Sequence, residues 1–392
     1  MRIAEVVTGT YRIPLAEPWV SAKYRITHHE YVVTEIRTEC GLTGTGWCQT
    51  IGVGGLAIEQ LLAAYLATTL VGEDPRNTER IWSRLWDECH FLGPAGVTTL
   101  ALATVDIALW DIKAKAANAP LYRLLGGMAD SVGVYASAVN LHLTQDQLLA
   151  QVEAQLALGY ETFKIKIGRN DPIDDLDRMR AVRKLIGPSR TLLLDVNQRW
   201  TSGEALVQLT ALREVNPGWI EEPMLSDDVA GHAHLRRTCG VPIAVGEQLG
   251  NRYDFWAYIR DAAADVLQPN VWKVGGVGEW MKIAHAAQLA NLVIAPHNSL
   301  ELSCHLVGAI RNGYLVENIF GGNLSDLGVV EQPITVTRGR IELPQQPGHG
   351  VVFHRDRLGA YRLDPGRPVQ REPSVHAGVG AGAELTQAAD FH

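Results

Sequence analysis

The segment Leu192-Leu193-Leu194-Asp195 is a short apolar run that stops at an acidic residue. The same pattern appears before it in Phe163-Lys164-Ile165-Lys166, which stops at a lysine, and after it in Trp219-Ile220-Glu221. Amphipathic segments of helix length separate these runs, an alternation typical of a parallel sheet with crossover helices. The polar side chains at the run ends would then meet at one mouth of a barrel, where active sites of such folds are built.

Further apolar runs extend this pattern along the chain. From about Val132 onward their ends are spaced by roughly 20 to 30 residues, which suits one strand and one helix per unit. The ends lie near Ala138, Lys166, Asp195, Glu221, Glu247, Asn270, His297 and Glu317. Eight such ends predict a closed barrel.

The segment before the barrel has a different pattern. Alternating residues and turn chemistry predict strands over 3–12, 31–38 and 44–48, and helical periodicity follows over 56–70, 78–89 and 98–117. Strands followed by helices predict an α+β unit.

The composition is that of a globular protein. The net charge of −8 comes from charges mixed along the 392 residues, so no basic stripe exists for nucleic acid to follow. No run of roughly 20 apolar residues lacks polar interruption, and we expect neither a membrane span nor export. Five scattered cysteines without a Cys-x-x-Cys pair argue against a disulfide framework or a zinc site, and favour a cytoplasmic location.

Three carboxylates form the candidate metal site. Asp195, Glu221 and Glu247 would converge at the ends of consecutive strands, and three oxygen ligands without sulfur or imidazole suit a hard cation such as Mg²⁺. Like charges cluster unfavourably unless a cation neutralises them, whereas one acidic residue alone would more often cap a helix. Glu222 and Asn197 are candidates for supporting contacts, with helix capping or loop hydrogen bonding as the alternative.

Several motifs follow one another in a characteristic order. Residues 103–115 read Ala-Thr-Val-Asp-Ile-Ala-Leu-Trp-Asp-Ile-Lys-Ala-Lys. The later motifs are Pro120-Leu121, Leu125-Gly126-Gly127, Lys164-Ile165-Lys166-Ile167-Gly168, Asp195-Val196-Asn197, Ile220-Glu221-Glu222-Pro223, Gly246-Glu247, Lys273-Val274-Gly275-Gly276 and Pro296-His297-Asn298. Together they resemble the mandelate racemase and muconate lactonising group of the enolase superfamily, from about residue 1 to residue 365.

The resemblance implies an α/β fold, a modified TIM barrel of (β/α)7β type with an N-terminal α+β capping domain. On this basis we expect the capping domain at 1–127, the catalytic barrel at 128–320 and a segment at 321–372 that returns to the capping domain. Residues 373–392, rich in Ala and Gly, are expected to form a mobile tail. We also expect a homo-oligomer.

The resemblance also implies roles for individual residues. In the mandelate racemase branch the second lysine of a Lys-x-Lys pair is the base on one face of the substrate, here Lys166. The histidine after the seventh strand, here His297, is its counterpart on the other face. The glutamate after the eighth strand, here Glu317, donates or shares a proton with the substrate carboxylate. Relatives that lactonise muconate or epimerise dipeptides carry a lysine where this chain has Asn270, so the chain resembles the racemase-like branch.

The lysine pair suits removal of a proton next to a carboxylate. Lys164 and Lys166 lie two residues apart on one strand, so their side chains point to the same side. We expect the Lys164 ammonium and the metal to lower the pKa of Lys166 toward working pH, as a base requires. Without the acid triad, two lysines at a barrel rim would be the simpler interpretation.

Asn270 departs from the family pattern, because racemase-like relatives usually hold an aspartate there that hydrogen-bonds the histidine. An amide can orient the imidazole of His297 but does not stabilise its charged form, so we expect a weaker base. Symmetric two-base racemisation is therefore disfavoured. A dehydratase fits better, with Lys166 as base and His297 or another acid protonating the departing hydroxyl.

The substrate is expected to be a small sugar acid or hydroxy acid. In the family a loop after the first strand closes over the substrate, here residues 17–29. Its residues Lys23, Tyr24, Arg25 and His28 suit a polyhydroxy acid, possibly with a second carboxylate, although loop charges are often simply solvated. Asn197 is a further substrate-binding candidate.

Three hypotheses remain at the level of sequence. The first is an acid-sugar dehydratase acting on an aldonate or aldarate to give a 2-keto-3-deoxy acid. The second is a racemase or epimerase of a 2-hydroxy acid. The third is a non-catalytic metal-binding barrel, which gives no physical reason to keep costly clustered charges.

Overall fold

An antiparallel sheet begins the chain. The computed structural model describes residues 1–21 and 24–364, and its first sheet contains β1 (Ile3–Val20), β2 (Arg25–Thr38) and β3 (Thr43–Thr50). The first two strands are longer than predicted, because pairing resumes at Trp19↔Ile26 beyond an irregularity at Pro14. Most of the predicted loop over 17–29 is therefore strand. Proline interrupts a ladder without ending the strand when it lies at such an irregularity.

Helices cover this sheet and form the cap with it. The helical segments are α1 (Gly55–Leu61), η1 (Leu62–Leu66), α2 (Ala67–Leu70), α3 (Thr78–Cys89), η2 (His90–Leu92), α4 (Val97–Ala116) and α5 (Leu121–Leu124). The buried helix α4 packs closely on β3. A Cβ at Gly46 would lie 1.9 Å from the backbone oxygen of Thr104, so this approach requires glycine.

A parallel barrel follows the cap. Its strands are β4 (Ser131–Ser137), β5 (Thr162–Lys166), β6 (Thr191–Asp195), β7 (Trp219–Glu221), β8 (Ile243–Val245), β9 (Val266–Leu267), β10 (Val293–Ile294) and β11 (Leu315–Ile319). They pair in sequence from β4 to β10, and β11 pairs with β4. A bridge between Ile294 and Gly313 joins the two ends of this path. The predicted fold class is confirmed.

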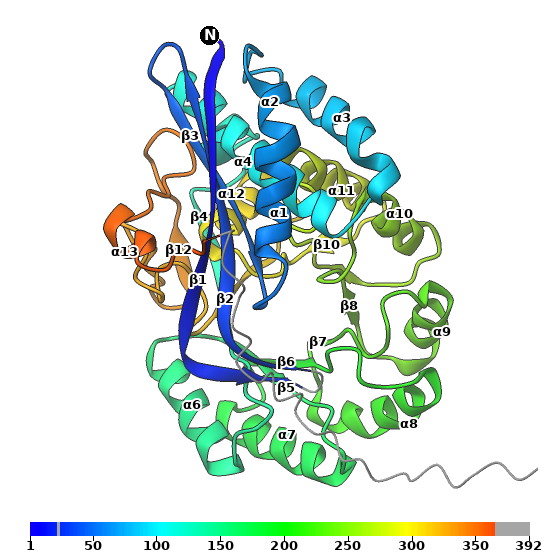
Figure 1. The fold of residues 1–392 in the computed structure, drawn as a ribbon. Coiled ribbons are helices and arrows are strands. Elements are labelled where there is room, and N and C mark those ends of the chain that lie inside the picture. Colours follow the sequence, from blue (N-terminus) through cyan, green and yellow to red (C-terminus); the bar gives the residue numbers. More distant parts are fainter. Residues whose placement is uncertain (22–23, 365–392) are drawn as a thin grey trace, which may run out of the picture.

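Helices alternate with these strands around the barrel (Figure 1). They are α6 (Gln145–Ala157), α7 (Pro172–Ile186), α8 (Ser202–Leu212) with η3 (Arg213–Val215), α9 (Val229–Cys239), α10 (Arg252–Arg260), α11 (Val277–Leu289) and α12 (Leu300–Ala309). A small apolar cluster fills the barrel interior, with the rings of Tyr135 and Trp219 edge to face at 5.6 Å. The barrel centre is therefore packed, and chemistry is confined to its mouth.

The cap and the barrel meet at the N-terminus of α11. Asp106 on α4 accepts a hydrogen bond from the backbone N–H of Gly278 at 3.0 Å, so one domain caps a helix of the other. A Cβ at Gly276 would lie 2.4 Å from the Asp106 carboxylate, which accounts for the glycine in the Lys273-Val274-Gly275-Gly276 motif. Burial raises the pKa of Asp106 to about 7.

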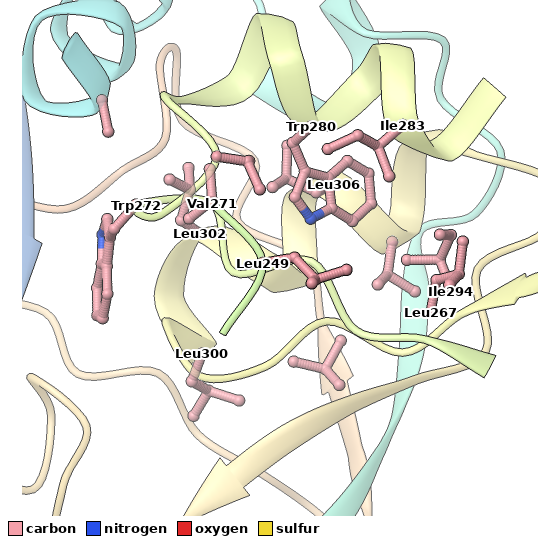
Figure 2. Packing of buried hydrophobic residues seen from close by; sticks show 14 of the residues in the cluster. Leu249, Leu267, Val271, Trp272, Trp280, Ile283, Ile294, Leu300, Leu302 and Leu306 are labelled. Atoms are coloured by element: carbon pink, nitrogen blue, oxygen red, sulfur yellow. The ribbon is translucent and has the colours of Figure 1, made fainter. Parts of the chain in front are cut away.

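Behind this joint, α11 and α12 bury large apolar side chains against the barrel. Figure 2 shows Trp280 beside Ile283 in this cluster, and its indole N–H donates to the Pro269 carbonyl at 3.0 Å. Trp272 points away from this group in Figure 2. The packing of Trp280 and its hydrogen bond to Pro269 thus support the turn after β9, which carries Asn270.

The chain after the barrel contributes β12 (Arg340–Glu342) and α13 (Arg355–Gly359). β12 adds to β4 in antiparallel sense, and residues 361–363 then reach β1, where Leu363 N–H donates to Thr10 at 2.8 Å. The domain limits given above stay predictions, and residues 373–392 lie outside the described residues. Within the described residues, no helix has both the length and the apolarity to cross a membrane.

Candidate active site

The three carboxylates come together at the barrel mouth. Asp195 ends β6, Glu221 ends β7, and Glu247 lies just beyond β8. Each offers an oxygen, these oxygens all lie within 4.8 Å of one another, and all three residues are buried. The acidic side chains at the ends of these three strands thus lie together at the barrel mouth, as predicted from the ends of the apolar runs.

The electrostatics of this cluster fit a divalent cation. Burial and then the charge of Asp195 raise the pKa of Glu221 to about 8. Burial also opposes ionisation of Asp195, but Lys166 and Lys164 outweigh it and hold the pKa of that carboxyl below its usual range. An all-oxygen, buried and mutually repelling donor set is what a hard cation such as Mg²⁺ stabilises.

Both lysines of β5 contact this cluster. Lys164 is fully buried, and its ammonium lies 2.7 Å from Glu221, 2.6 Å from Glu317 and 3.5 Å from Asp195. Among residues 1–21 and 24–364, the ammonium of Lys166 forms an ion pair with Asp195 only, and its backbone N–H donates to Asn140 at 3.0 Å. Lys164 is therefore enclosed by carboxylates, whereas Lys166 is the lysine that lines the cavity.

The pKa of Lys166 was expected to fall through the Lys164 ammonium and the metal together, and the side chains alone do not produce that fall. Burial, the largest cause, and the Lys164 ammonium lower it, but Asp195 together with Glu247 and Tyr24 raises it more, and the pKa of Lys166 stands above its ordinary value. The contact of Lys166 with Asp195 on the neighbouring strand opposes this fall, and it is not visible in the sequence. A cation that neutralises Asp195 would remove the opposing cause.

Glu317 is held as an ionised acceptor. Burial would raise its pKa, but Lys164 and then His297 lower it to about 2. Its second oxygen accepts from the backbone N–H of Asn298 at 3.0 Å. In this arrangement Glu317 is ionised, and its role of donating or sharing a proton with the substrate carboxylate stays a prediction.

His297 lines the same cavity as Lys166. Its Nε2 lies 3.2 Å from Glu247 and 3.9 Å from Glu317, and its Nδ1 lies 3.0 Å from the side-chain nitrogen of Asn270. The Asn270 side-chain oxygen already accepts from the backbone N–H of Trp272 at 2.9 Å. The amide NH₂ must therefore face the ring, so Nδ1 accepts and the imidazole proton lies on Nε2.

Of the predicted substrate-binding residues in the cap, some lie at the cavity and others do not. Tyr24 lines the cavity with Lys166 and His297, and burial, with Glu247 next, raises the pKa of its phenol. Arg25 is exposed and is not among the lining residues, and His28 is turned to Gly52, with Nε2 3.3 Å from its carbonyl. Lys23 lies outside the described residues.

The two residues proposed to support the metal ligands are buried beside them. Asn197 donates its backbone N–H to Asp195 at 2.9 Å, and its side-chain NH₂ has no partner among the described residues. Its expected contact with the substrate stays a prediction. Glu222 accepts from Gln198 at 2.5 Å, and burial raises its pKa well above the usual range.

Sequence reasoning missed most of the cavity lining. Gln49 on β3 accepts a hydrogen bond from Asn298 at 3.0 Å and donates one to His29. These hydrogen bonds connect the cap to the barrel. Asn298 stands in the Pro296-His297-Asn298 motif, which was a usable signal. The remaining lining residues, without such a signal, are Trp19, Ile26, Ile51, Ser137, Val139 and Ile319.

Comparison with known proteins agrees with this geometry. Residues 3–126 match the mandelate racemase / muconate lactonizing enzyme N-terminal domain, and residues 147–357 match the enolase C-terminal domain-like family. The chain is 34% identical over 359 residues to 3,6-anhydro-alpha-L-galactonate cycloisomerase of Streptomyces coelicolor, covering 91% of this chain and 98% of that protein. It is 34% identical over 315 residues to L-talarate/galactarate dehydratase of Salmonella typhimurium, covering 79% of each.

A solved relative contains magnesium. The crystal structure of L-talarate dehydratase from Polaromonas sp. JS666, complexed with Mg and L-glucarate, has a TM-score of 0.85 and 33% identity, covering 93% of this chain and 98% of that one. With the carboxylate triad here able to bind a metal ion, magnesium is confirmed as the cofactor. The relatives are enzymes and include dehydratases, cycloisomerases and racemases. The predicted family is confirmed: the chain belongs to the mandelate racemase/muconate lactonizing enzyme family of the enolase superfamily.

Proposed function

We propose that the protein is a magnesium-dependent lyase that removes the proton α to the carboxylate of a sugar acid and eliminates water to give a 2-keto-3-deoxy acid. The observation that carries this proposal is the placing of Lys166 and His297 in one cavity with Glu247, beside the carboxylate triad. Dehydratases of sugar acids among the relatives support the substrate class.

Asp195, Glu221 and Glu247 would hold Mg²⁺. When bound there, the ion supplies Lewis-acid stabilisation of negative charge on the substrate carboxylate. This stabilisation is necessary because removal of an α-proton from a carboxylate would otherwise place two negative charges on one small group.

The chain's own residues move the protons. Lys166 takes the α-proton at Nζ, and the electron pair left on carbon expels the hydroxyl of the next carbon. His297 presents its Nε2 proton to the departing oxygen, while Asn270 fixes that tautomer. The ion pair between Lys164 and Glu317, 2.6 Å apart, keeps both side chains charged. We expect this pair to lie next to the carboxylate of the substrate.

A racemase or epimerase of a 2-hydroxy acid is the second candidate. Lys166 and His297 line the same cavity, as two bases on opposite faces require. The hydrogen bond from Asn270 weighs against it, because Nε2 carries the proton and has no lone pair free to accept another. A third outcome is ring opening, since the chain is 34% identical to a cycloisomerase over 91% of its length.

The test is incubation of the full-length protein with Mg²⁺ and a panel of aldonates, aldarates, anhydro sugar acids and 2-hydroxy acids. Formation of a 2-keto acid with loss of water supports the proposal. A change in optical rotation without keto acid supports the racemase, and keto acid formed from a ring substrate without loss of water supports a cycloisomerase. No turnover across the panel would contradict all three.

A further inference from the structure

Each carboxylate of the triad has a hydrogen-bond donor beside both of its oxygens. For two of them the donors come from the mouth of the barrel: they are Asn197 and Lys166 for Asp195, and Gln248 and His297 for Glu247. Glu221 differs, because one of its donors comes from the packed interior. The ammonium of Lys164 lies 2.7 Å from its Oε1, and the indole N–H of Trp219 donates to its Oε2 at 3.2 Å.

Packing fixes the direction of this indole N–H. Trp219 precedes Glu221 by two residues on β7, so both side chains point to the same side of the strand, into the barrel. Trp219 is 1% exposed and belongs to the small cluster that fills the barrel interior. Its ring meets Tyr135 edge to face, with 5.6 Å between the ring centroids. A ring enclosed in this way cannot turn to follow the carboxylate, so the carboxylate is held where the N–H points.

The same pair of rings supports the ion pair of Glu221 with Lys164. The Lys164 ammonium lies over the ring of Tyr135, 5.4 Å from its centroid, while the Trp219 indole donates to Glu221. A buried ion pair is stable only when hydrogen bonds also satisfy its remaining atoms. The two aromatic rings of the interior therefore contact both members of the pair and connect barrel packing to a carboxylate of the metal site.

We infer that Trp219 is a positioning residue that holds Glu221 in the orientation a small cation requires, and that it thereby sets the affinity and selectivity of the site for Mg²⁺. Mg²⁺ demands near-ideal octahedral geometry, whereas Ca²⁺ accepts more oxygens in a flexible arrangement, including both oxygens of one carboxylate. A carboxylate released from the indole can turn and offer both oxygens to the larger ion. The inference concerns metal binding and goes beyond the proposed reaction, so its test needs no substrate.

The experiment measures the binding of Mg²⁺ and of Ca²⁺ to the metal-stripped full-length protein by isothermal titration calorimetry. Trp219→Phe keeps an aromatic ring in the barrel and removes the N–H that reaches Glu221. We expect the Kd for Mg²⁺ to rise by about tenfold to a hundredfold in this variant, as is usual when the partner of a metal ligand is lost. The Kd for Ca²⁺ should rise much less, so the preference for Mg²⁺ should narrow.

Trp82→Phe is the matched control. Trp82 is also buried, and its indole N–H donates to the backbone carbonyl of Gly275 at 2.8 Å, so its loss should lower stability in urea titration and leave both Kd values unchanged. In the ¹H–¹⁵N NMR spectrum of the wild type, the Trp219 indole resonance should shift when Mg²⁺ is added, and the Trp82 resonance should not. If Trp219→Phe does not fold, a benzothiophene ring in place of the Trp219 indole keeps the shape without the N–H and should give the same losses.

An unchanged Kd for Mg²⁺ in Trp219→Phe overturns the inference. Equal losses for Mg²⁺ and Ca²⁺, or losses equal to those in Trp82→Phe, also overturn it, since they indicate a role in folding alone. None of these outcomes bears on the proposed lyase activity, which turnover of the acid panel decides, so the two failures are distinguishable.

Discussion

Replacing Asn270 with aspartate should reverse the hydrogen bond to His297. The amide now donates to Nδ1 over 3.0 Å because its oxygen is occupied by the Trp272 N–H at 2.9 Å. A carboxylate offers only acceptors, so in Asn270→Asp the imidazole proton moves to Nδ1 and Nε2 gains a free lone pair toward the cavity. His297 should become a proton acceptor and lose its place as a donor.

The size of the effect follows from the type of bond exchanged. A hydrogen bond to a charged group contributes about 1.5–3 kcal/mol, and each 1.4 kcal/mol is roughly a factor of ten in rate. Proton exchange on the His297 face should therefore rise by about tenfold to a hundredfold, while elimination slows or its pH optimum moves upward. Loss of the Nε2 donor, together with a more stable imidazolium, accounts for the slower elimination.

The assay is incorporation of deuterium at the α-carbon of both C2 epimers of the substrate in D₂O, followed beside keto-acid formation over a range of pH. Asn270→Ala is the control, because it removes both the donor and the acceptor. Unchanged exchange on the His297 face in Asn270→Asp would refute the reasoning. So would a wild-type enzyme that interconverts the epimers at comparable rates in both directions without losing water.

Three further predictions concern the base, the joint between the domains and the cap. Lys166→Ala should lower α-proton exchange by about a hundredfold to ten-thousandfold and leave Mg²⁺ binding and the folded circular dichroism spectrum in place; near-normal turnover would show that another group is the base. Asp106→Ala should lower the free energy of unfolding by about 1 kcal/mol in urea titration, because the N-terminus of α11 loses its acceptor, and Asp106→Asn, which keeps an acceptor, should lose less. Gly46→Ala should cost about 1–3 kcal/mol by the same titration, because the added Cβ would lie 1.9 Å from a backbone oxygen of α4; a stability equal to that of Gly203→Ala, whose added Cβ would meet nothing within 4 Å, contradicts this packing.

The barrel and its metal site were predictable because the end of each strand is apparent in the sequence. An apolar run stops at a polar residue where the strand meets the mouth, and Asp195 and Glu221 are the last residues of β6 and β7. The helix at Thr78–Cys89 was predicted with both ends correct, since its apolar positions repeat at helical spacing. Such patterns can be predicted from sequence because they depend on residues that are close together in the chain.

The features that were not predictable depend on contacts between distant residues. The prolines of β1 resemble a loop in sequence, yet pairing with β2 carries the strand past them to Val20. Burial lowers the pKa of Lys166 while Asp195 on the next strand raises it, and the direction of the Asn270 amide is set by the backbone N–H of Trp272. Neither partner is apparent before the fold brings it into contact.

The central claim is that a magnesium site at the barrel mouth enables α-proton removal by Lys166. The most direct measurement is deuterium incorporation at the α-carbon of an active sugar acid in D₂O, before and after verified removal of divalent ions and again after Mg²⁺ is restored. We predict exchange with Mg²⁺, none after removal, and recovery on readdition. Undiminished exchange in the metal-stripped enzyme would contradict the account.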